Sequence, residues 1–205
     1  MKKVLIACEY SGIVRDEFLK KGFDAYSCDI LDCESQYNQD SKRHFKCDVL
    51  EILDQEWDLM VAHPPCTHLS VSGARWFTEG KKPMYLRDDA IDFVKKLMDA
   101  PIEHIAIENP VSVISSYIRK SDQMINPYQF GHKEYKRTCL WLKNLPKLIE
   151  TNNVKEETDK LHPKDKHRIW WIGGGKGKER SKFYPGIAKA MANQWGDHIL
   201  KGMEI

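Results

Sequence analysis

A cysteine that follows two prolines is the residue in this sequence best suited to nucleophilic chemistry. The stretch 58–67 reads Asp-Leu-Met-Val-Ala-His-Pro-Pro-Cys-Thr, so an apolar segment leads directly into Pro64, Pro65 and Cys66. Proline restricts φ, and two successive prolines therefore limit the directions in which the thiol can point. A thiol in such a loop becomes nucleophilic where helix amides or cationic side chains favour its thiolate. The alternative is a small, buried and unreactive cysteine.

A carboxylate occupies a similar place after a second apolar segment. The run 102–107 is apolar and leads into Glu108, Asn109 and Pro110. A carboxylate at the end of a buried strand is seldom left without a partner. If burial raises its pKa, Glu108 is protonated and can donate to a ring nitrogen, as an acidic partner of Cys66. The alternative is a structural carboxylate at Glu108 and a helix N-cap at Asn109.

Three further polar positions have the spacing of a nucleotide-binding region. Ser11 and Gly12 form a turn after the first apolar run, but a single glycine does not satisfy the G-x-G-x-x-G pattern of dinucleotide-binding proteins. Asp29, which is followed by Ile30, ends the next strand-like run, where a carboxylate can accept hydrogen bonds from both ribose hydroxyls of a nucleoside. Asp48 can accept from an exocyclic amino group such as that of adenine, or can equally well cap a helix that starts at residue 49.

These residues need a scaffold that brings the ends of several strands together. Apolar runs of strand length occupy 3–8, 24–30, 58–62 and 102–107, and they alternate with segments of helical period at 13–19 and 86–98. Strands that alternate with helices predict a doubly wound, mostly parallel α/β sheet, which is a Rossmann-like architecture. Ligands bind at the carboxyl ends of such strands. The loops 9–12, 29–31, 63–70 and 108–110 are therefore expected to form one site.

The remainder of the chain fits the same single domain. A further strand is predicted at 138–142, a short or turn-like helix at 49–53, and an amphipathic helix at 184–200. The segment 145–178 is predicted to be irregular. At 205 residues the chain fits one domain, 1–205, with a short irregular insertion at about 143–180.

Composition excludes a protein that binds nucleic acid through bulk charge. The formal net charge is +2, from 32 Lys and Arg against 30 Asp and Glu. Basic residues cluster in 133–147 and 155–182, and acidic residues are prominent in 24–58. Any affinity for nucleic acid must come from such local patches, for which the alternative is a set of solvated faces. The first apolar run is cut short at Glu9 and Tyr10, so we expect neither a secretory segment nor a membrane span, and a cytoplasmic protein.

The six cysteines follow no disulfide framework and are expected to be free thiols. A zinc site formed by Cys28, Cys33, His44 and Cys47 is conceivable. However, the spacings C-x4-C and H-x2-C match none of the common structural zinc patterns. We therefore expect no metal, and small thiols near strand ends are the better interpretation.

The order of these motifs resembles the C5-cytosine DNA methyltransferases. The family's cofactor loop is similar to 7–12 (Ala-Cys-Glu-Tyr-Ser-Gly), its Pro-Cys nucleophile motif to 64–66, and its Glu-Asn motif to 108–109. The stretch 127–141 resembles the basic motif that precedes a strand in the family, and 181–195 resembles its C-terminal cofactor-side helix. The amino-acid sequences of 128–132 and 136–141 look most like those of small methyltransferase-like proteins of phages and prophages.

The resemblance implies a Rossmann-like S-adenosylmethionine-dependent methyltransferase that acts on DNA. It implies that Cys66 adds to C6 of cytosine while Glu108 engages N3, so that C5 becomes nucleophilic and accepts a methyl group. The implied cofactor-binding residues are Glu9, Ser11, Gly12, Asp29, Ile30, Asp48 and Pro64. The implied substrate-binding residues are Asn109, Lys136, Arg137 and Thr138.

The chain differs from the family in having no long target-recognition region. Only about forty residues separate Trp141 from Ser181, and they include Trp170, Trp171 and the glycine run 173–175. Such a loop could stack on bases and touch phosphates, or could be a solvated loop with a tryptophan anchor. We expect weak sequence selection, a partner protein or a smaller substrate. The oligomeric state stays open.

Three alternative functions remain. The chain could modify C5 in RNA or in a free pyrimidine nucleotide, or could bind nucleic acid or a partner protein without turnover. An amino-group methyltransferase is a third alternative, because such enzymes carry a Pro-Pro motif at the same edge. In them an Asp or Asn normally precedes the motif and an aromatic residue follows it, whereas here His63 precedes it and Cys66 follows.

Overall fold

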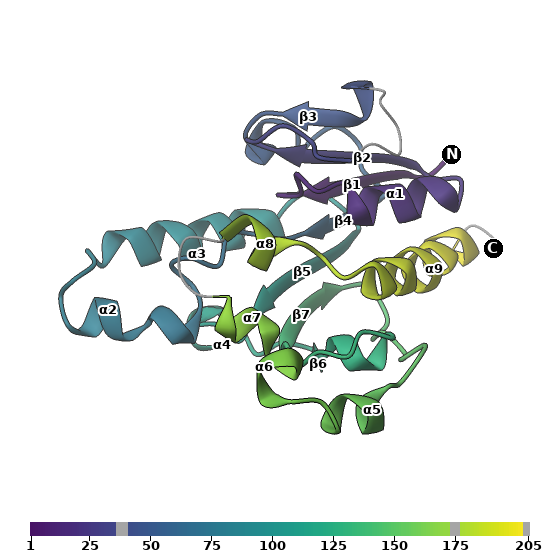
Figure 1. Cartoon of the computed structure of the whole chain (residues 1–205). Helices are drawn as coiled ribbons and strands as arrows, with labels where there is room; N and C mark the ends of the chain where they lie inside the picture. Colours follow the sequence, from purple (N-terminus) through teal and green to yellow (C-terminus); the bar gives the residue numbers. More distant parts are fainter. Residues whose placement is uncertain (36–40, 173–176, 203–205) are drawn as a thin grey trace.

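Seven strands form one sheet in the part of the chain that the computed structural model describes, which is residues 1–35, 41–172 and 177–202 (Figure 1). Their order across the sheet is β3-β2-β1-β4-β5-β7-β6. The strands are β1 Lys3–Ala7, β2 Asp24–Asp29, β3 His44–Lys46, β4 Leu59–Ala62, β5 His104–Pro110, β6 Gln123–Ile125 and β7 Thr138–Lys143.

The sheet is mostly parallel, with one reversed strand. Strands β1 to β5 pair with one another in parallel, whereas β7 is antiparallel to both of its neighbours, β5 and β6. Because β7 is reversed, its first residue, Thr138, pairs with the last residue of β5, Pro110. The start of β7 therefore lies at the edge where the parallel strands end. This arrangement is a Rossmann-like α/β fold with a mostly parallel sheet, so the predicted fold class is confirmed.

Helices connect and flank the strands. The α-helices are α1 Ile13–Lys20, α2 Arg75–Thr78, α3 Tyr85–Met98, α4 Ile114–Tyr117, α5 Lys155–Asp159, α6 Pro163–Lys166, α7 Arg168–Trp171, α8 Gly177–Ser181 and α9 Pro185–Lys201. The 3-10 helices are η1 Ser41–Arg43, η2 Val49–Glu51, η3 Val71–Gly73 and η4 Pro127–Gln129. None of these helices, within the described residues, is long and apolar enough to cross a membrane.

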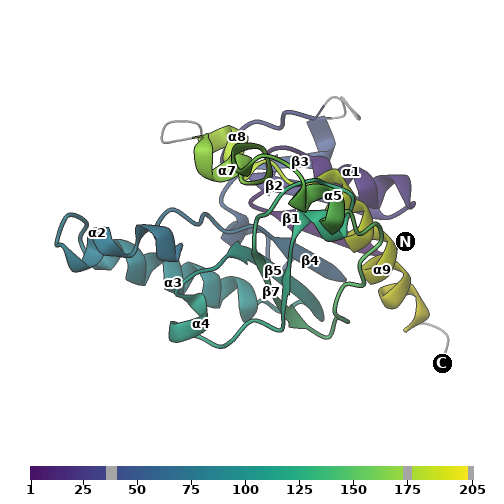
Figure 2. The ribbon, with the colours of Figure 1, turned by 60° about the horizontal axis from the view of Figure 1, so that its bottom comes forward.

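Helices α1 and α9 cover one face of the sheet (Figures 1 and 2). Buried residues recur in α9 at the helical period, at Ile187, Met191 and Trp195. They pack against Val14 and Phe18 of α1 and against the side chains of β1, β4 and β7 that point to this face. The Trp195 ring is fully buried, and its Nε1 donates to the Pro146 carbonyl over 2.9 Å, so the C-terminal helix is fixed to the loop after β7.

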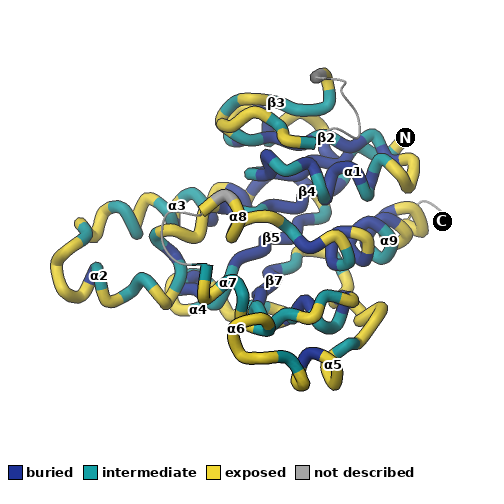
Figure 3. Tube along the Cα trace, viewed as in Figure 1, coloured by how far each residue is buried: buried dark blue, intermediate teal, exposed yellow. Residues whose placement is uncertain are grey.

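Helix α3 and the short helix η2 cover the opposite face. Ile91, Val94 and Leu97 of α3 are buried against the alternate side chains of β4, β5 and β7. Figure 3 shows that the central strands are buried over most of their length, whereas the connection around α2 is largely exposed. The connection from β4 to α3, which contains Cys66, is therefore anchored mainly through the buried side chains of Leu69 and Phe77.

The structure differs from the sequence-based expectations in three places. Strand β5 continues through Glu108 and Asn109, which were expected to lie in a loop, because these residues pair with Leu140 and Cys139 of β7. Strands β3 and β6 were not predicted, since three residues are too few to show a period. The segment 145–178, predicted to be irregular, contains α5, α6, α7 and the start of α8. Its glycine run 173–175 lies outside the described residues.

Candidate active site at the carboxyl edge of the sheet

The loop that carries Cys66 is fixed to the neighbouring strand. Asn109 is 1% exposed, and its Nδ2 donates to the carbonyl of Pro64 over 2.8 Å. The amides of Leu69 and Ser70 donate to the carbonyl of Cys66 over 3.1 and 2.9 Å, which closes a tight turn. Cys66 as a whole residue is exposed. Asn109 thus fixes the loop that carries Cys66, and it does not cap a helix.

The loops that follow β4 and β5 are joined by further backbone hydrogen bonds. The amide of Val71 donates to Val111, and the amide of Val113 donates to Leu69, over 3.2 and 2.9 Å. In the sheet, Ala62 of β4 is in register with Ile107 of β5. Cys66 and Glu108 therefore come from adjacent strand ends, as the sequence predicts for residues that act together.

Glu108 is buried and forms a hydrogen bond with His63. The carboxylate residue is 8% exposed, and its Oε2 lies 3.0 Å from Nδ1 of His63. Burial alone would raise the pKa of Glu108, but the hydrogen bond and the charge of His63, together with Lys136, hold it below the ordinary value. The pKa of Glu108 is therefore not raised, as a protonated Glu108 would require, and at neutral pH its side chain is a carboxylate.

The pKa of the Cys66 thiol is raised above its ordinary value. The largest cause is shielding from water by the surrounding segments, although the residue as a whole is exposed, and the negative charge of Glu108 adds to it. The cations Lys136 and Arg180 act in the opposite direction. Cys66 is therefore mostly a thiol at neutral pH, and its thiolate needs further stabilisation when a substrate binds.

His63 is a polar centre of this edge to which the sequence analysis assigned no role. The imidazole lies beside Phe183, with ring centroids 4.6 Å apart, and its Nε2 is buried without a hydrogen-bond partner among the described residues. Its charge also lowers the pKa of the buried Glu9, although burial raises that pKa overall. In the sequence, His63 directly follows a four-residue apolar strand. This pattern indicates where the histidine lies but not which residue it contacts.

The predicted cofactor loop turns sharply between β1 and α1. Cys8 and Gly12 both have left-handed backbone conformations, with φ of 59° and 72°. The Glu9 carboxylate accepts from the amides of Val14 and Arg15 over 2.7 and 3.2 Å, and from Oγ of Ser11 over 3.1 Å. Glu9 therefore caps helix α1 from inside the loop, so its direct contact with a cofactor stays a prediction.

Asp29 and Asp48 come together near Cys8. Their negative charges, after burial, are the causes that raise the pKa of Cys8 to about 12. The Asp29 side chain accepts from the amide of Leu31 over 3.0 Å, and Asp48 accepts from Leu50 over 3.0 Å, which confirms the N-cap interpretation of Asp48. Two carboxylates from the ends of neighbouring strands β2 and β3 thus share one part of the edge.

Ile30 follows Asp29 and is 74% exposed, although it is a large apolar side chain. Pro64, also predicted to bind a cofactor, is buried and uses its carbonyl to accept from Asn109. The structure therefore leaves Ile30 open to a ligand and gives Pro64 a role in the loop.

The basic segment before β7 reaches the same edge because β7 is reversed. Lys136 donates through Nζ to the Arg180 carbonyl over 3.4 Å, and its charge acts on both Cys66 and Glu108. Arg137 is exposed. Thr138 is only 3% exposed, and its hydroxyl donates to the carbonyl of Lys136. The hydroxyl therefore forms a local hydrogen bond within the segment before β7.

The four side chains considered for zinc do not converge on one point. The sulfurs of Cys28 and Cys47 are 3.8 Å apart, whereas Cys33 accepts from the buried guanidinium of Arg15 over 3.3 Å. Both ring nitrogens of His44 have other partners, Oγ of Ser27 and the carbonyl of Leu31. No group of three or more potential metal ligands occurs within residues 1–35, 41–172 and 177–202.

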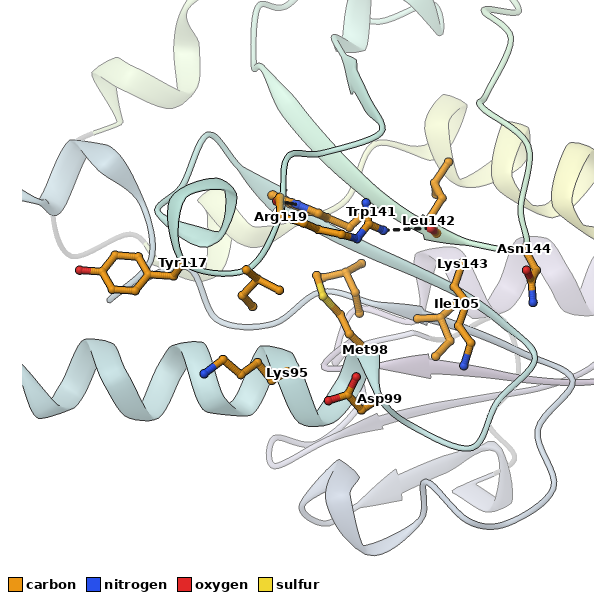
Figure 4. Close-up of a pocket in the computed structure, with 12 residues that line it drawn as sticks. Lys95, Met98, Asp99, Ile105, Tyr117, Arg119, Trp141, Leu142, Lys143 and Asn144 are labelled. Atoms are coloured by element: carbon orange, nitrogen blue, oxygen red, sulfur yellow. Dashed lines mark hydrogen bonds between the residues drawn. The ribbon is translucent and has the colours of Figure 1, made fainter.

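A cavity of about 670 Å³ lies away from this edge, between the end of α3 and strands β5 and β7 (Figure 4). Met98, Ile105 and Trp141 line it, and Arg119 stands at its rim. The Trp141 Nε1 donates to the Arg119 carbonyl over 2.8 Å, so this wall is fixed. The cavity contains none of the residues that the sequence analysis selected.

The fold defines a protein of the Rossmann-like α/β class whose candidate site lies at the carboxyl ends of the parallel strands. No protein-family model and no curated protein matches the sequence. Among solved structures, the chain is similar to a protein from E. coli described as a "putative DNA modification methyltransferase encoded within prophage". The two are 16% identical with a TM-score of 0.45, and the match covers 80% of this chain and 56% of that one.

Proposed function

We propose that the protein is an S-adenosylmethionine-dependent methyltransferase that modifies C5 of cytosine in DNA. The observation that supports this most is the pairing of a proline-restrained Cys66 with a buried Glu108 at adjacent strand ends. A thiol and a carboxylate are the two groups that covalent activation of a pyrimidine ring needs, one for C6 and one for the N3 side. The carboxylates of Asp29 and Asp48 lie farther along the same edge.

Residues at the far part of the edge suit a nucleoside cofactor. Asp29 can accept from ribose hydroxyls, and Asp48 can accept from the amino group of adenine. The exposed side chain of Ile30 offers an apolar surface that a purine ring would cover. S-adenosylmethionine would supply an electrophilic methyl group at this edge.

In the proposed reaction, the Cys66 thiolate forms a bond from Sγ to C6 of cytosine. The electrons of the C5–C6 double bond would then make C5 nucleophilic, and transfer of the methyl group from S-adenosylmethionine to C5 would leave S-adenosylhomocysteine. Loss of the C5 proton to water and cleavage of the bond from Sγ to C6 would regenerate the thiolate and release the product. Covalent addition divides one difficult substitution into two easier steps.

Glu108 and His63 have complementary parts in this scheme. As a carboxylate, Glu108 is ready to accept a hydrogen bond from the exocyclic amino group of cytosine. Negative charge would develop at N3 after the thiolate adds to C6, and a proton on Glu108 would stabilise that charge by a hydrogen bond to N3. The Nδ1 atom of His63 lies 3.0 Å from Oε2 of Glu108. His63 is thus placed to hold that proton next to the reacting base.

The positive charges of Lys136 and Arg180 favour the thiolate of Cys66 and can also contact phosphates of DNA. A cytosine within a duplex would have to leave the base stack to reach Cys66. RNA or a free nucleotide would offer the same ring to the same residues.

The test is transfer of a labelled methyl group from S-adenosylmethionine to duplex DNA, single-stranded DNA, RNA and cytosine nucleotides. Wild type should label cytosine C5, and Cys66→Ala should not. The matched control is Cys33→Ser, which keeps an acceptor for Arg15 and lies outside the proposed chemistry.

A second experiment isolates the covalent step. With a 5-fluorocytosine substrate, wild type should form a stable adduct that Cys66→Ser abolishes. Measurable cofactor binding without transfer to any substrate would reject the enzyme and favour a binding protein.

A further inference from the structure

Two adjacent tryptophans on α7 are exposed to solvent. The exposed fractions are 75% for Trp170 and 56% for Trp171. Tryptophan is normally largely buried, so two neighbouring exposed rings indicate a contact surface. Lys164 of α6 places its Nζ 5.5 Å from the centre of the Trp171 ring. We call these three residues the tryptophan patch.

The tryptophan patch is attached to the segment that leads into the candidate active site. Arg168, at the start of α7, forms an ion pair of 2.7 Å with Glu134. The ring of His167 stacks on Tyr135 with centroids 5.4 Å apart, and the Tyr135 amide donates to the Lys166 carbonyl. The next residue, Lys136, acts electrostatically on Cys66.

The position of α7 agrees with these contacts. Figures 1 and 2 show α7 and α8 together over the edge of the sheet, on the side opposite to the body of α9. The carbonyl of Arg180, in α8, accepts from Lys136. The patch therefore belongs to the same part of the molecule as Lys136, whose charge acts on Cys66.

The charge around the patch favours an anionic partner. Lys164 has a ring partner in Trp171 and no carboxylate partner within the described residues, and Arg137, which follows Lys136, is exposed. An aromatic ring beside free lysine charge suits a nucleic-acid strand, because a base stacks on the ring while a cation meets the phosphate.

We propose that the tryptophan patch stacks on unpaired bases next to the target cytosine, so that the nucleic acid is bound as a single strand. The proposal rests on the proposed function and names its substrate form. Bases in a duplex stack on each other and offer no free face to a tryptophan, whereas every unpaired base does. With about forty residues between Trp141 and Ser181, the chain uses ring stacking in place of a groove-reading domain.

The test measures binding and needs no turnover. A labelled twelve-nucleotide strand with one cytosine among thymines, alone or annealed to its complement, is titrated with protein and followed by fluorescence anisotropy. Wild type should prefer the single strand, and Trp171→Ala should weaken that binding at least about fivefold, the loss expected for one base stack. Trp171→Phe should restore most of it, and Lys164→Ala should weaken it and reduce its dependence on salt.

Two exposed residues outside the patch provide matched controls. Ile149→Ala removes an apolar side chain that is 73% exposed, and Lys189→Ala removes an exposed cation on α9. Neither should change the affinity for the single strand. Circular dichroism and the sedimentation coefficient should stay the same in every variant.

The outcomes separate this proposal from the proposed function. Equal loss of single-strand and duplex binding, no loss in Trp171→Ala, or a wild type that prefers duplex would overturn the patch proposal, even where methyl transfer occurs. A change of oligomeric state in Trp171→Ala would assign the patch to self-association and would also overturn it. If single-strand binding depends on the patch but no methyl group is transferred, the proposed methyltransferase activity is rejected and the patch proposal stands.

Discussion

At the scale of single residues, one histidine influences the pKa values of two buried carboxylates in the candidate site. His63 contacts Glu108 directly and acts on the buried Glu9, so two carboxylates at this edge are influenced by the same imidazole. Burial would otherwise neutralise both carboxylates. For Glu108, His63 and Lys136 together lower the pKa by more than burial raises it, whereas for Glu9 burial raises the pKa by more than its partners lower it. The two carboxylates are therefore electrostatically different although both are buried.

Replacing Glu108 by glutamine should make Cys66 more reactive. The negative charge of Glu108 helps to raise the pKa of Cys66, so its removal lowers that pKa and increases the thiolate fraction at a fixed pH. We expect alkylation of Cys66 by iodoacetamide at pH 7.5 to become roughly two- to tenfold faster, since one pKa unit corresponds to a tenfold change. Peptide mass spectrometry identifies the alkylated residue.

The opposite change should follow from Lys136→Met, which keeps the aliphatic stem but removes a charge that lowers the pKa of Cys66. Alkylation should slow down in this variant. Two variants that change the rate in the same direction would contradict the electrostatic explanation.

The same glutamine variant should lose stability in a pH-dependent way. The pKa of Glu108 is lowered in the folded state, so its contribution to the free energy of unfolding is present above the unfolded-state value of about 4.3. That contribution disappears as the pH falls through the folded-state pKa. Because a hydrogen bond to a charged group is worth about 1 kcal/mol more than a neutral one, Glu108→Gln should be less stable by about that amount at pH 7.

Urea denaturation at pH 7, 5 and 3.5 measures this difference. Groups that do not contact Glu108 titrate in both proteins, so the difference between them reports on position 108 and its partner His63. It should shrink as the solution becomes more acidic, and a constant difference would show that Glu108 acts through packing instead of charge.

At the scale of elements, apolar runs and helical periods were sufficient to predict the central strands and α1, α3 and α9. The expected strand 58–62 and helix 86–98 correspond to β4 Leu59–Ala62 and α3 Tyr85–Met98. The pairing of β7 with β5 could not be predicted, because it depends on contacts between residues about thirty positions apart. For that reason Glu108 and Asn109 were expected in a loop and lie in a strand.

The candidate site shows the same limit. Strand ends indicated which segments would meet, and Cys66 and Glu108 do come from adjacent strands. The partner of Glu108 could not be inferred, since His63 is 45 positions away and its orientation depends on packing against Phe183. The direction of the Glu108 pKa shift depends on this long-range hydrogen bond, so local sequence patterns could not predict it.

The turn between β1 and α1 requires glycine at position 12. Its φ is 72°, and a Cβ there would lie 2.6 Å from Cβ of Ser35 and 2.8 Å from Nη2 of Arg15. Gly22 ends the same helix with a φ of 85° and has nothing within 4 Å of such a Cβ. The two glycines thus share a backbone requirement, and only Gly12 adds a steric one.

Gly12→Ala should therefore destabilise the protein more than Gly22→Ala. Both variants lose about 1–2 kcal/mol for the left-handed backbone, and Gly12→Ala loses about 1–3 kcal/mol more for overpacking. Urea denaturation of the two variants in parallel gives the difference. Equal losses would mean that the segment around Ser35 moves aside without cost.

At the scale of the whole molecule, the C-terminal segment closes over the N-terminal loops. The hydroxyl of Tyr10 lies 2.9 Å from Oγ of Ser181, Lys182 forms an ion pair of 3.5 Å with Glu34, and Phe183 covers His63. Helix α9 then continues along α1. The edge is consequently built from both ends of the chain, and a ligand bound there would stabilise the entire fold.

That coupling makes thermal unfolding a measurement of the cofactor site that is independent of activity. A ligand at a hundred times its Kd adds about 2.7 kcal/mol, which for about 200 residues corresponds to a Tm increase of roughly 5–10 °C. We expect such an increase with S-adenosylmethionine. Asp29→Ala should reduce it strongly at the same concentration, because hydrogen bonds from ribose hydroxyls to a charged acceptor are worth about 1.5–3 kcal/mol each.

The Tm of Asp29→Ala without ligand should change little, since among the described residues the Asp29 carboxylate accepts a hydrogen bond only from the nearby Leu31 amide. Asp32→Ala is the matched control: it removes a carboxylate that is 82% exposed, three positions further on and paired with Lys46, and should keep the full ligand-induced increase. If both variants lose the increase equally, the acidic character of the segment matters and not the position of Asp29 at the end of β2. If neither variant loses it, the cofactor is held elsewhere on the edge, and the assignment of Asp29 to the ribose is wrong.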